Sequence, residues 1–216
     1  MTANWETVSE LATAGGTLVL AVATFVSVRQ GQRATRISER AARIAEQSLL
    51  AAQRPLLVNS RLQDPKQRVS FREGEYLDIL GGRAAIKVTD NAVYMALSIR
   101  NVGTGLAVLH GWCMRVGPQR DRVRPSLEDF IAQQLDIFLA PGEVGFWEGA
   151  FRGADTDEYK NMVAGVIGSE MLMLSLLYSD YEGGQRMISQ FNLRPQDDMW
   201  LAGVIRHFNV DRPDPR

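Results

Sequence analysis

Residues 92–116 read AVYMALSIRNVGTGLAVLHGWCMRV, and this stretch decides the fold class because its hydrophobic residues recur with a period of two. Strict alternation over this length predicts a half-buried strand over residues 92–99. A second strand is expected after residue 105. Six residues share one of its faces: Leu106, Val108, His110, Trp112, Met114 and Val116. We expect His110 and Trp112 on that face to lie in the core.

Between these strands, Gly103-Thr104-Gly105 resembles a loop that cradles a phosphate. In such a loop the glycines open a helix, and the helix amides point at the anion. No helical pattern follows here, and neither a Gly-Lys-Ser/Thr run nor the third glycine of a dinucleotide fingerprint is present. Asn101 and the two glycines therefore predict a turn, and we predict no cofactor.

Further short strands are expected from alternation and apolar runs, at residues 56–61, 76–80, 85–88, 135–139, 144–151, 171–178 and 185–193. The strands at 76–80 and 85–88 are expected to pair as a hairpin. Short helices are expected at residues 126–133 and 156–166, while residues 200–208 fit either a helix or a strand. Many short strands with Gly and Pro turns favour an immunoglobulin-like antiparallel β-sandwich. We therefore predict a mainly β fold with N-terminal helices, in which the sandwich with short helical insertions covers residues 55–210.

Residues 11–28, LATAGGTLVLAVATFVSV, contain no charge. As a helix they are roughly 27 Å long, close to the hydrocarbon thickness of a bilayer. A signal peptide and a buried soluble helix are the alternatives, but the leader is acidic and no polar face is visible. We predict a transmembrane helix here. The expected anchoring side chains are Trp5 at the interface and Leu18, Leu20, Val22, Phe25 and Val26 in the span.

Five arginines follow the span directly: Arg29, Arg33, Arg36, Arg40 and Arg43. The positive-inside bias places that side in the cytoplasm. We therefore expect a single-pass protein of the plasma membrane, with residues 1–10 outside and the C-terminal domain cytoplasmic. The unpaired Cys113 agrees with a reducing compartment. The same arginines are candidates for contact with lipid headgroups.

Residues 29–54 form a basic helix with small or apolar residues at heptad spacing: Ala34, Ile37, Ala41, Ile44, Ser48 and Ala51. Three uses are open. The helix can be a stalk that pairs with copies of itself through residues 34–51, it can lie on the inner leaflet, or it can pack on the following domain.

The net charge of the 216 residues is −1, so no global field attracts nucleic acid. On a strand, His110 and Cys113 point to opposite faces, and no catalytic or metal-ligating set is predicted. The prediction is a membrane-anchored, non-enzymatic binding protein whose partners are the bilayer and an unidentified protein. The alternatives are a small tethered hydrolase that uses carboxylates of the β domain, and an inner-leaflet lipid or ligand carrier. Residues 211–216 are expected to be a disordered tail.

Several motifs occur in a recognisable order. The basic helix ends in Gln-Arg-Pro at 53–55, an Asn-x-Gly-x-Gly-x-Ala turn occupies 101–107, and Tyr-Ser-Asp-Tyr-Glu-Gly-Gly occupies 178–184. With the N-terminal span, this order resembles a loose group of uncharacterised bacterial single-pass membrane proteins. Leu106 stands where a proline is common in such turns. The resemblance implies the architecture and no catalytic residues.

Overall fold

The computed structural model describes residues 5–118 and 123–213. In the first helix it also leaves out the side chains of residues 5–8, 11–12, 47 and 50–51. The chain divides into two compact units, residues 1–49 and 50–216.

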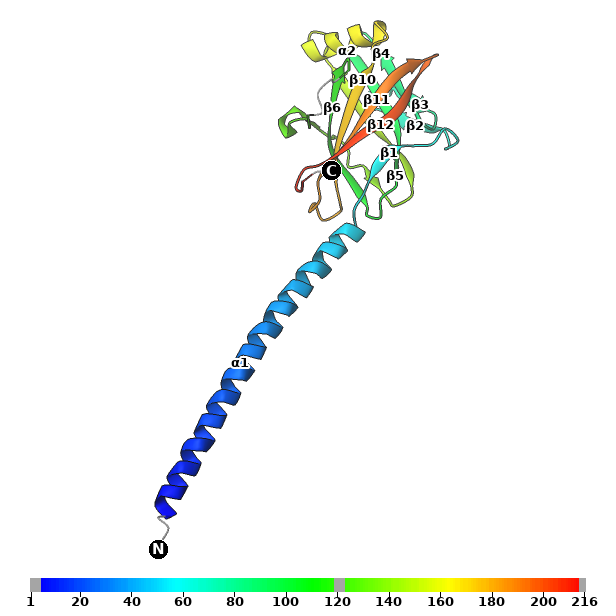
Figure 1. Ribbon diagram of the computed structural model, residues 1–216. Helices are drawn as coiled ribbons and strands as arrows, with labels where there is room; N and C mark the ends of the chain where they lie inside the picture. Colours follow the sequence, from blue (N-terminus) through cyan, green and yellow to red (C-terminus); the bar gives the residue numbers. More distant parts are fainter. Residues whose placement is uncertain (1–4, 119–122, 214–216) are drawn as a thin grey trace. The chain divides into compact units, whose positions relative to one another are not determined.

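The described residues of the first unit belong to one helix, α1, which runs from Trp5 to Ala52 (Figure 1). The hydroxyl groups in its uncharged stretch do not break it, because each donates to the carbonyl oxygen four residues earlier. The Thr13 and Thr17 hydroxyls do so at 2.8 Å, and Thr24 and Ser27 form the same bond. Among the residues whose side chains the structure describes, which leave out Leu11 and Ala12, no helix is long and apolar enough to cross a membrane.

The second unit is mainly β, as predicted. Its helical elements are α2 (Asp157–Ile167) and a 3-10 turn, η1 (Leu127–Asp129). Its strands are β1 (Leu57–Asn59), β2 (Gln67–Ser70), β3 (Tyr76–Ile79), β4 (Arg83–Val88), β5 (Ala92–Asn101), β6 (Ala107–Val116), β7 (Ile131–Ala132), β8 (Phe138–Leu139), β9 (Val144–Arg152), β10 (Leu172–Ser179), β11 (Met187–Gln196) and β12 (Met199–Asn209).

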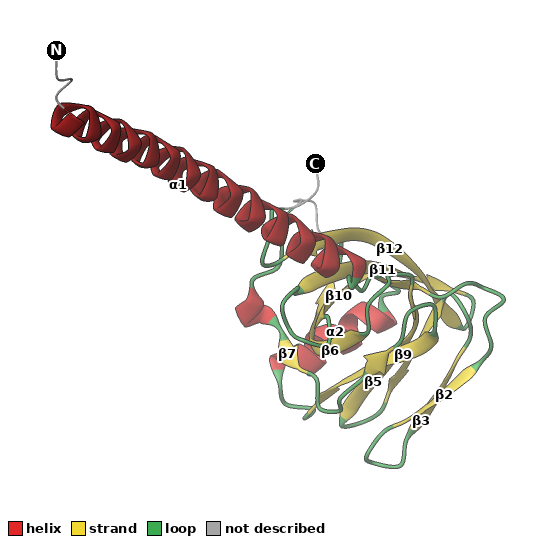
Figure 2. Ribbon diagram, turned by 90° about the horizontal axis from the view of Figure 1, so that it is seen from below, coloured by secondary structure: helices red, strands yellow, loops and turns green. Residues whose placement is uncertain are grey.

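Ten strands form one antiparallel sheet in the order β1-β5-β4-β12-β11-β10-β6-β7, with β9 beside β5 and β8 beside β6. The sheet is curled (Figure 2), so that the ring of Trp112 on β6 meets that of Trp147 on β9 with centroids 5.4 Å apart. A sandwich has two facing sheets, whereas here one continuous ladder surrounds the core. The immunoglobulin-like class is therefore not confirmed.

The core inside the curl is filled by apolar side chains from almost every strand. Among the largest are Trp147, Tyr178 and Phe191, all with no exposed surface. A second cluster lies on the outer face of β5, where the separate β2–β3 hairpin packs Val69 and Ile79 against it. This hairpin explains why β5 is buried on both faces rather than half-buried.

The predicted inward face of β6 is correct only for its second half. Trp112 and Met114 are buried as expected, but in the first half Ala107 and Leu109 point inward. The cause is an irregularity in the pairing with β10, where Leu177 is opposite Gly111 and Tyr178 is opposite Leu109. The extra residue is His110, and such a bulge moves the inward face by one residue.

Strand positions were predicted better than strand pairing. The strands at 76–80 and 85–88 exist, but β3 pairs with β2, and β4 pairs with β5 and β12. The ambiguous stretch 200–208 is strand β12. Residues 126–133 form η1 and β7 rather than a longer helix. α2 begins as predicted, where the Thr156 hydroxyl accepts a hydrogen bond from the amide of Tyr159.

Candidate functional site

The predicted membrane-anchor side chains all belong to α1. Leu18, Val22 and Phe25 lie on one face, since residues four and seven apart align on a helix, and Leu20 points to another face. The described anchor residues are exposed, with Leu18 at 67% and Phe25 at 63%. The Trp5 side chain lies outside the described residues. The described apolar side chains of this run are therefore exposed on more than one face of α1.

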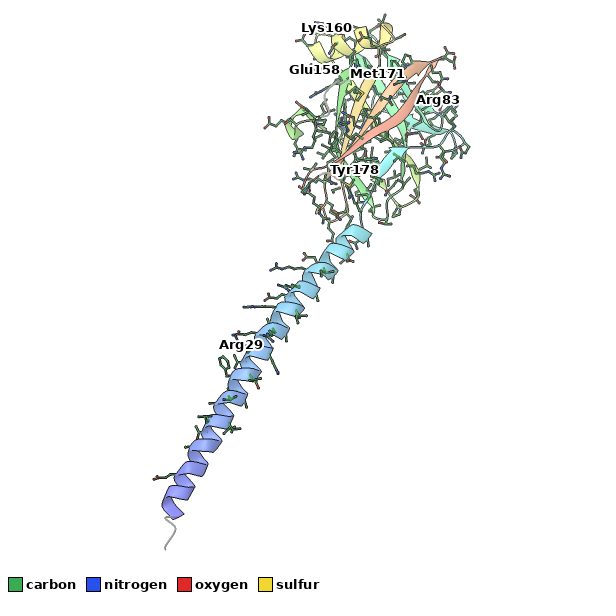
Figure 3. All side chains as sticks on the ribbon, viewed as in Figure 1. Arg29, Arg83, Glu158, Lys160, Met171 and Tyr178 are labelled. Carbon is green, nitrogen blue, oxygen red and sulfur yellow. The ribbon has the colours of Figure 1, made fainter. Side chains whose placement is uncertain are left out.

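The five arginines form a stripe along α1. Their spacings are four, three, four and three residues, so on one uninterrupted helix they share one face. The Arg29 guanidinium lies over the Phe25 ring, 5.7 Å from its centroid, which joins this arginine stripe to the apolar run (Figure 3). The residue spacing in the sequence contains this signal, whereas the net charge of the whole chain does not show it. The arginine stripe gives α1 one strongly basic side.

The Asn-x-Gly-x-Gly turn has a structural role where the chain enters the β domain. Asn101 is fully buried, and its amide group donates to the carbonyl oxygens of Gly105, at 2.7 Å, and Leu139, at 2.9 Å. Its carbonyl oxygen accepts from the amides of Leu56 and Gly103, each at 3.0 Å. The side chain thus joins three segments, and we call this turn together with residues 53–57 the junction clasp.

The two glycines of the junction clasp are required by close approach of the backbone. A Cβ on Gly103 would lie 2.3 Å from the Arg54 carbonyl oxygen, and one on Gly105 would lie 1.7 Å from that of Gln53. Neither glycine has a positive φ. The turn prediction is therefore correct, and the glycines admit the incoming chain instead of a phosphate group.

A buried polar network holds the other side of the incoming chain. The Tyr178 hydroxyl accepts from the Leu57 amide at 3.2 Å, and the Ser189 hydroxyl donates to the Leu57 carbonyl oxygen at 2.9 Å. Ser189 also contacts Nδ1 of His207 at 2.8 Å. Burial and then the charge of Arg54 lower the pKa of His207, whereas burial raises the pKa of Tyr178. Ser189 has no exposed surface, so this serine cannot reach a substrate.

His110 does not lie in the core as predicted. As the extra residue of the β6 bulge, its side chain is exposed, and its Nε2 atom contacts the Ser179 hydroxyl at 2.7 Å. Cys113, which was expected on the face opposite His110, is buried, and burial raises the pKa of its thiol. His110 and Cys113 do not form a joint site.

Most carboxylates with altered pKa values are paired with arginine. Arg68 and Lys66 lower the pKa of Asp78, and Arg152 lowers that of Glu73. Asp211 is bonded to Arg186 at 2.6 Å, so the expected disordered tail begins with a residue held in an ion pair, while residues 214–216 lie outside the described residues. Glu148 differs, because burial raises its pKa.

Within residues 5–118 and 123–213, no three His, Cys, Asp or Glu side chains lie close enough together to hold a metal ion. No family model matches the sequence, and no curated protein matches it. Among solved structures, the chain is similar to a beta-glucosidase from Kluyveromyces marxianus, with 18% sequence identity and a TM-score of 0.21. The alignment covers 64% of this chain and 15% of the glucosidase chain. A likeness this weak carries no argument about fold or activity.

Proposed function

We propose that this protein is a single-pass membrane protein that holds a cytoplasmic β domain beside the bilayer, and that the domain acts by binding. The observation that carries the proposal is one uninterrupted helix in which an uncharged run of 18 residues is followed by five arginines. An apolar run of this length matches the hydrocarbon core, and flanking arginines are retained on the cytoplasmic side. Residues 1–10 then face outward.

We propose that the second half of α1 is a stalk. Arg43 lies 15 residues beyond Val28, which is roughly 22 Å along a continuous helix. A helix that lay on the inner leaflet would have to bend after the span. The continuity of α1 therefore supports a stalk in which Arg29 and Arg33 are near the headgroups and the later arginines project away from them. The heptad positions 34–51 are then free to pair with a second copy.

We propose binding rather than catalysis for the β domain. Its interior is filled with apolar side chains, which argues against a lipid carried inside the curl of the sheet. It has two serine–histidine contacts, Ser189 with His207 and Ser179 with His110, and neither serine has any exposed surface. Most of its carboxylates with altered pKa values are tied to arginines. The junction clasp supports a tethering role, because it fixes the point at which the helix joins the domain. A tether raises the effective concentration of the domain for partners at the membrane.

Membrane extraction of the full chain tests the anchor. The variant Leu18→Glu with Val22→Glu places two acids on one face of the uncharged run, at a cost of roughly 2.5–3.5 kcal/mol for each acid. The matched control is Ser38→Glu with Ala42→Glu, which has the same spacing in the second half of the helix. The natural chain and the control should stay in the membrane pellet after alkaline carbonate, and the variant should appear in the supernatant. Release of the natural chain by carbonate would contradict the proposal.

A further inference from the structure

A cleft lies at the place where the curled sheet does not close. Strands β7 and β9 end the ladder, since β7 pairs with β6 and β9 pairs with β5. A side chain crosses the gap between them, where the Gln133 amide donates from Nε2 to the Glu148 carbonyl oxygen at 3.2 Å. The cleft beside this bond is lined by Phe71, Trp112, Gln133, Glu148, Gly149 and Arg152, among others, and has about 40 Å³ of room. That space admits a small planar group.

Two hydrogen-bond acceptors in this cleft have no donor. The Gln133 Oε1 atom is buried and has no hydrogen-bond partner among the described residues. Its amide cannot turn over, because the oxygen would then face the Glu148 carbonyl oxygen. The Glu148 carboxylate is half-buried, and no described residue forms a hydrogen bond or ion pair with it. A buried acceptor without a donor is destabilising, so Gln133 Oε1 favours a ligand that donates, and the Glu148 carboxylate can accept from the same ligand.

The charge in the cleft also favours a cation. Arg152 is the basic residue in its lining, and the Arg152 guanidinium is already bonded to Glu73 at 2.7 Å. Arg152 and the more distant Arg72 act on the Glu148 carboxylate only through their charge. The carboxylate of Glu148 is therefore the lining charge that lacks a partner.

The floor of the cleft is aromatic. Trp112 meets Trp147 and Phe151 edge to face, with centroids 5.4 and 5.1 Å apart. Gly149 keeps this floor open, since a Cβ there would lie 2.9 Å from the Trp112 ring. Phe71 from the end of β2 lines the same cleft. Aromatic rings attract cations, and a planar guanidinium can stack on a ring while it donates in its own plane.

We propose that this cleft binds a guanidinium group, held by the Glu148 carboxylate and Gln133 Oε1 and placed against Trp112. The group is supplied either by a free small guanidine compound or by an arginine side chain of a partner protein. The proposal is independent of the membrane anchor, since a chain that fails the extraction test above retains the same cleft. If the domain acts by binding, the guanidinium group is the chemical class of ligand that we expect it to bind.

Titration of the full chain in detergent tests the cleft, with the indole signals of Trp112 and the side-chain amide signals of Gln133 followed by NMR. The two probes are methylguanidinium chloride and an acetylated Gly-Arg-Gly amide, with sodium chloride at equal ionic strength as the control. Saturable shifts with either probe are expected. A response to the peptide alone identifies a protein arginine as the source, and a response to methylguanidinium as well identifies the group itself as sufficient.

The charge contribution is tested with Glu148→Gln, which keeps the shape of the side chain. It should raise the dissociation constant at least tenfold. The control Glu143→Gln alters an exposed carboxylate in the turn before the same strand and should leave the constant within twofold. In the natural chain, lowering the pH until Glu148 is protonated should abolish binding as well. An absence of saturable shifts with both probes, or equal affinity of the natural chain and Glu148→Gln, would overturn the proposal.

Discussion

Single side chains fix the point at which the helix joins the β domain. Asn101 makes four hydrogen bonds to three segments, and two glycines leave room for the backbone at Gln53 and Arg54. The sequence predicted a turn at this place but not its partner, since the partner lies about 50 residues earlier in the chain. The same holds for Glu148. The alternation of residues 144–151 predicts that Glu148 and Trp147 point to opposite faces of the strand. It does not predict the cleft beside Glu148, because residues outside this strand also line that cleft.

Replacement of Asn101 by Ala should lower the free energy of unfolding by about 3 kcal/mol. The substitution removes the side-chain partner of two half-buried amides and two carbonyl oxygens, and a lost partner of a buried group costs about 1–3 kcal/mol before relaxation. Denaturant titration of the full chain in detergent measures the change. The control Asn161→Ala alters an exposed residue of α2 and should stay within about 0.5 kcal/mol. Equal stability of the two variants would show that the junction clasp is not a stabilising contact.

Stability should also fall in mildly acidic solution because of His207. Its folded pKa is below the ordinary value of 6.5, so the unfolded chain takes up a proton more readily than the folded one. This contribution to stability is complete above about pH 7 and is lost as the pH falls below 6.5 toward the folded pKa. His110, whose pKa is also lowered, acts in the same direction.

Denaturant titrations between pH 7.5 and 5.5 measure this dependence. The variant His207→Gln should lose less stability over the range than the natural chain, and His110→Gln should remove a separate part of the loss. An unchanged pH dependence in His207→Gln would mean that burial and the charge of Arg54 do not hold the His207 imidazole neutral in the folded chain.

At the scale of elements, the period of the hydrophobic residues and the turn residues located the strands well. Which strand pairs with which depends on contacts between residues that are far apart in the sequence. The apolar run that became β10 and the hairpin turn at 180–184 were legible locally, because their neighbours are adjacent in sequence. The pairing of β4 with β12 was not, since these two strands meet across more than a hundred residues of sequence. The bulge at His110 changes which residues of the first half of β6 point inward, and no local sequence pattern predicts such an insertion.

The heptad positions of α1 give a prediction at this scale. Ile37 and Ile44 are exposed and share the small-residue face, so they should pack in a self-associated stalk. Ile37→Asp with Ile44→Asp should shift the sedimentation mass in detergent from an oligomer to one copy. Ala42→Asp, on another face of α1, should not change it. A natural chain that sediments as one copy would rule out pairing through residues 34–51.

At the scale of the whole molecule, the proposal joins an anchor, a stalk and a binding domain in one chain. The anchor and the stalk are read from α1, whose second half carries the arginine stripe. The mainly β class and the N-terminal helix were predictable because they depend on local periodicity. The transmembrane placement, the immunoglobulin-like class and the bacterial group that the motifs resemble stay proposals.

Thiol labelling in intact cells tests the span and its orientation most directly. Two single-cysteine variants are compared in a Cys113→Ser background: Ser9→Cys before the uncharged run and Ser38→Cys after it. We predict that a membrane-impermeant maleimide labels Ser9→Cys in intact cells and labels Ser38→Cys only after lysis. If both variants resist labelling until lysis, or if Ser38→Cys is labelled from outside, the proposed membrane placement is contradicted.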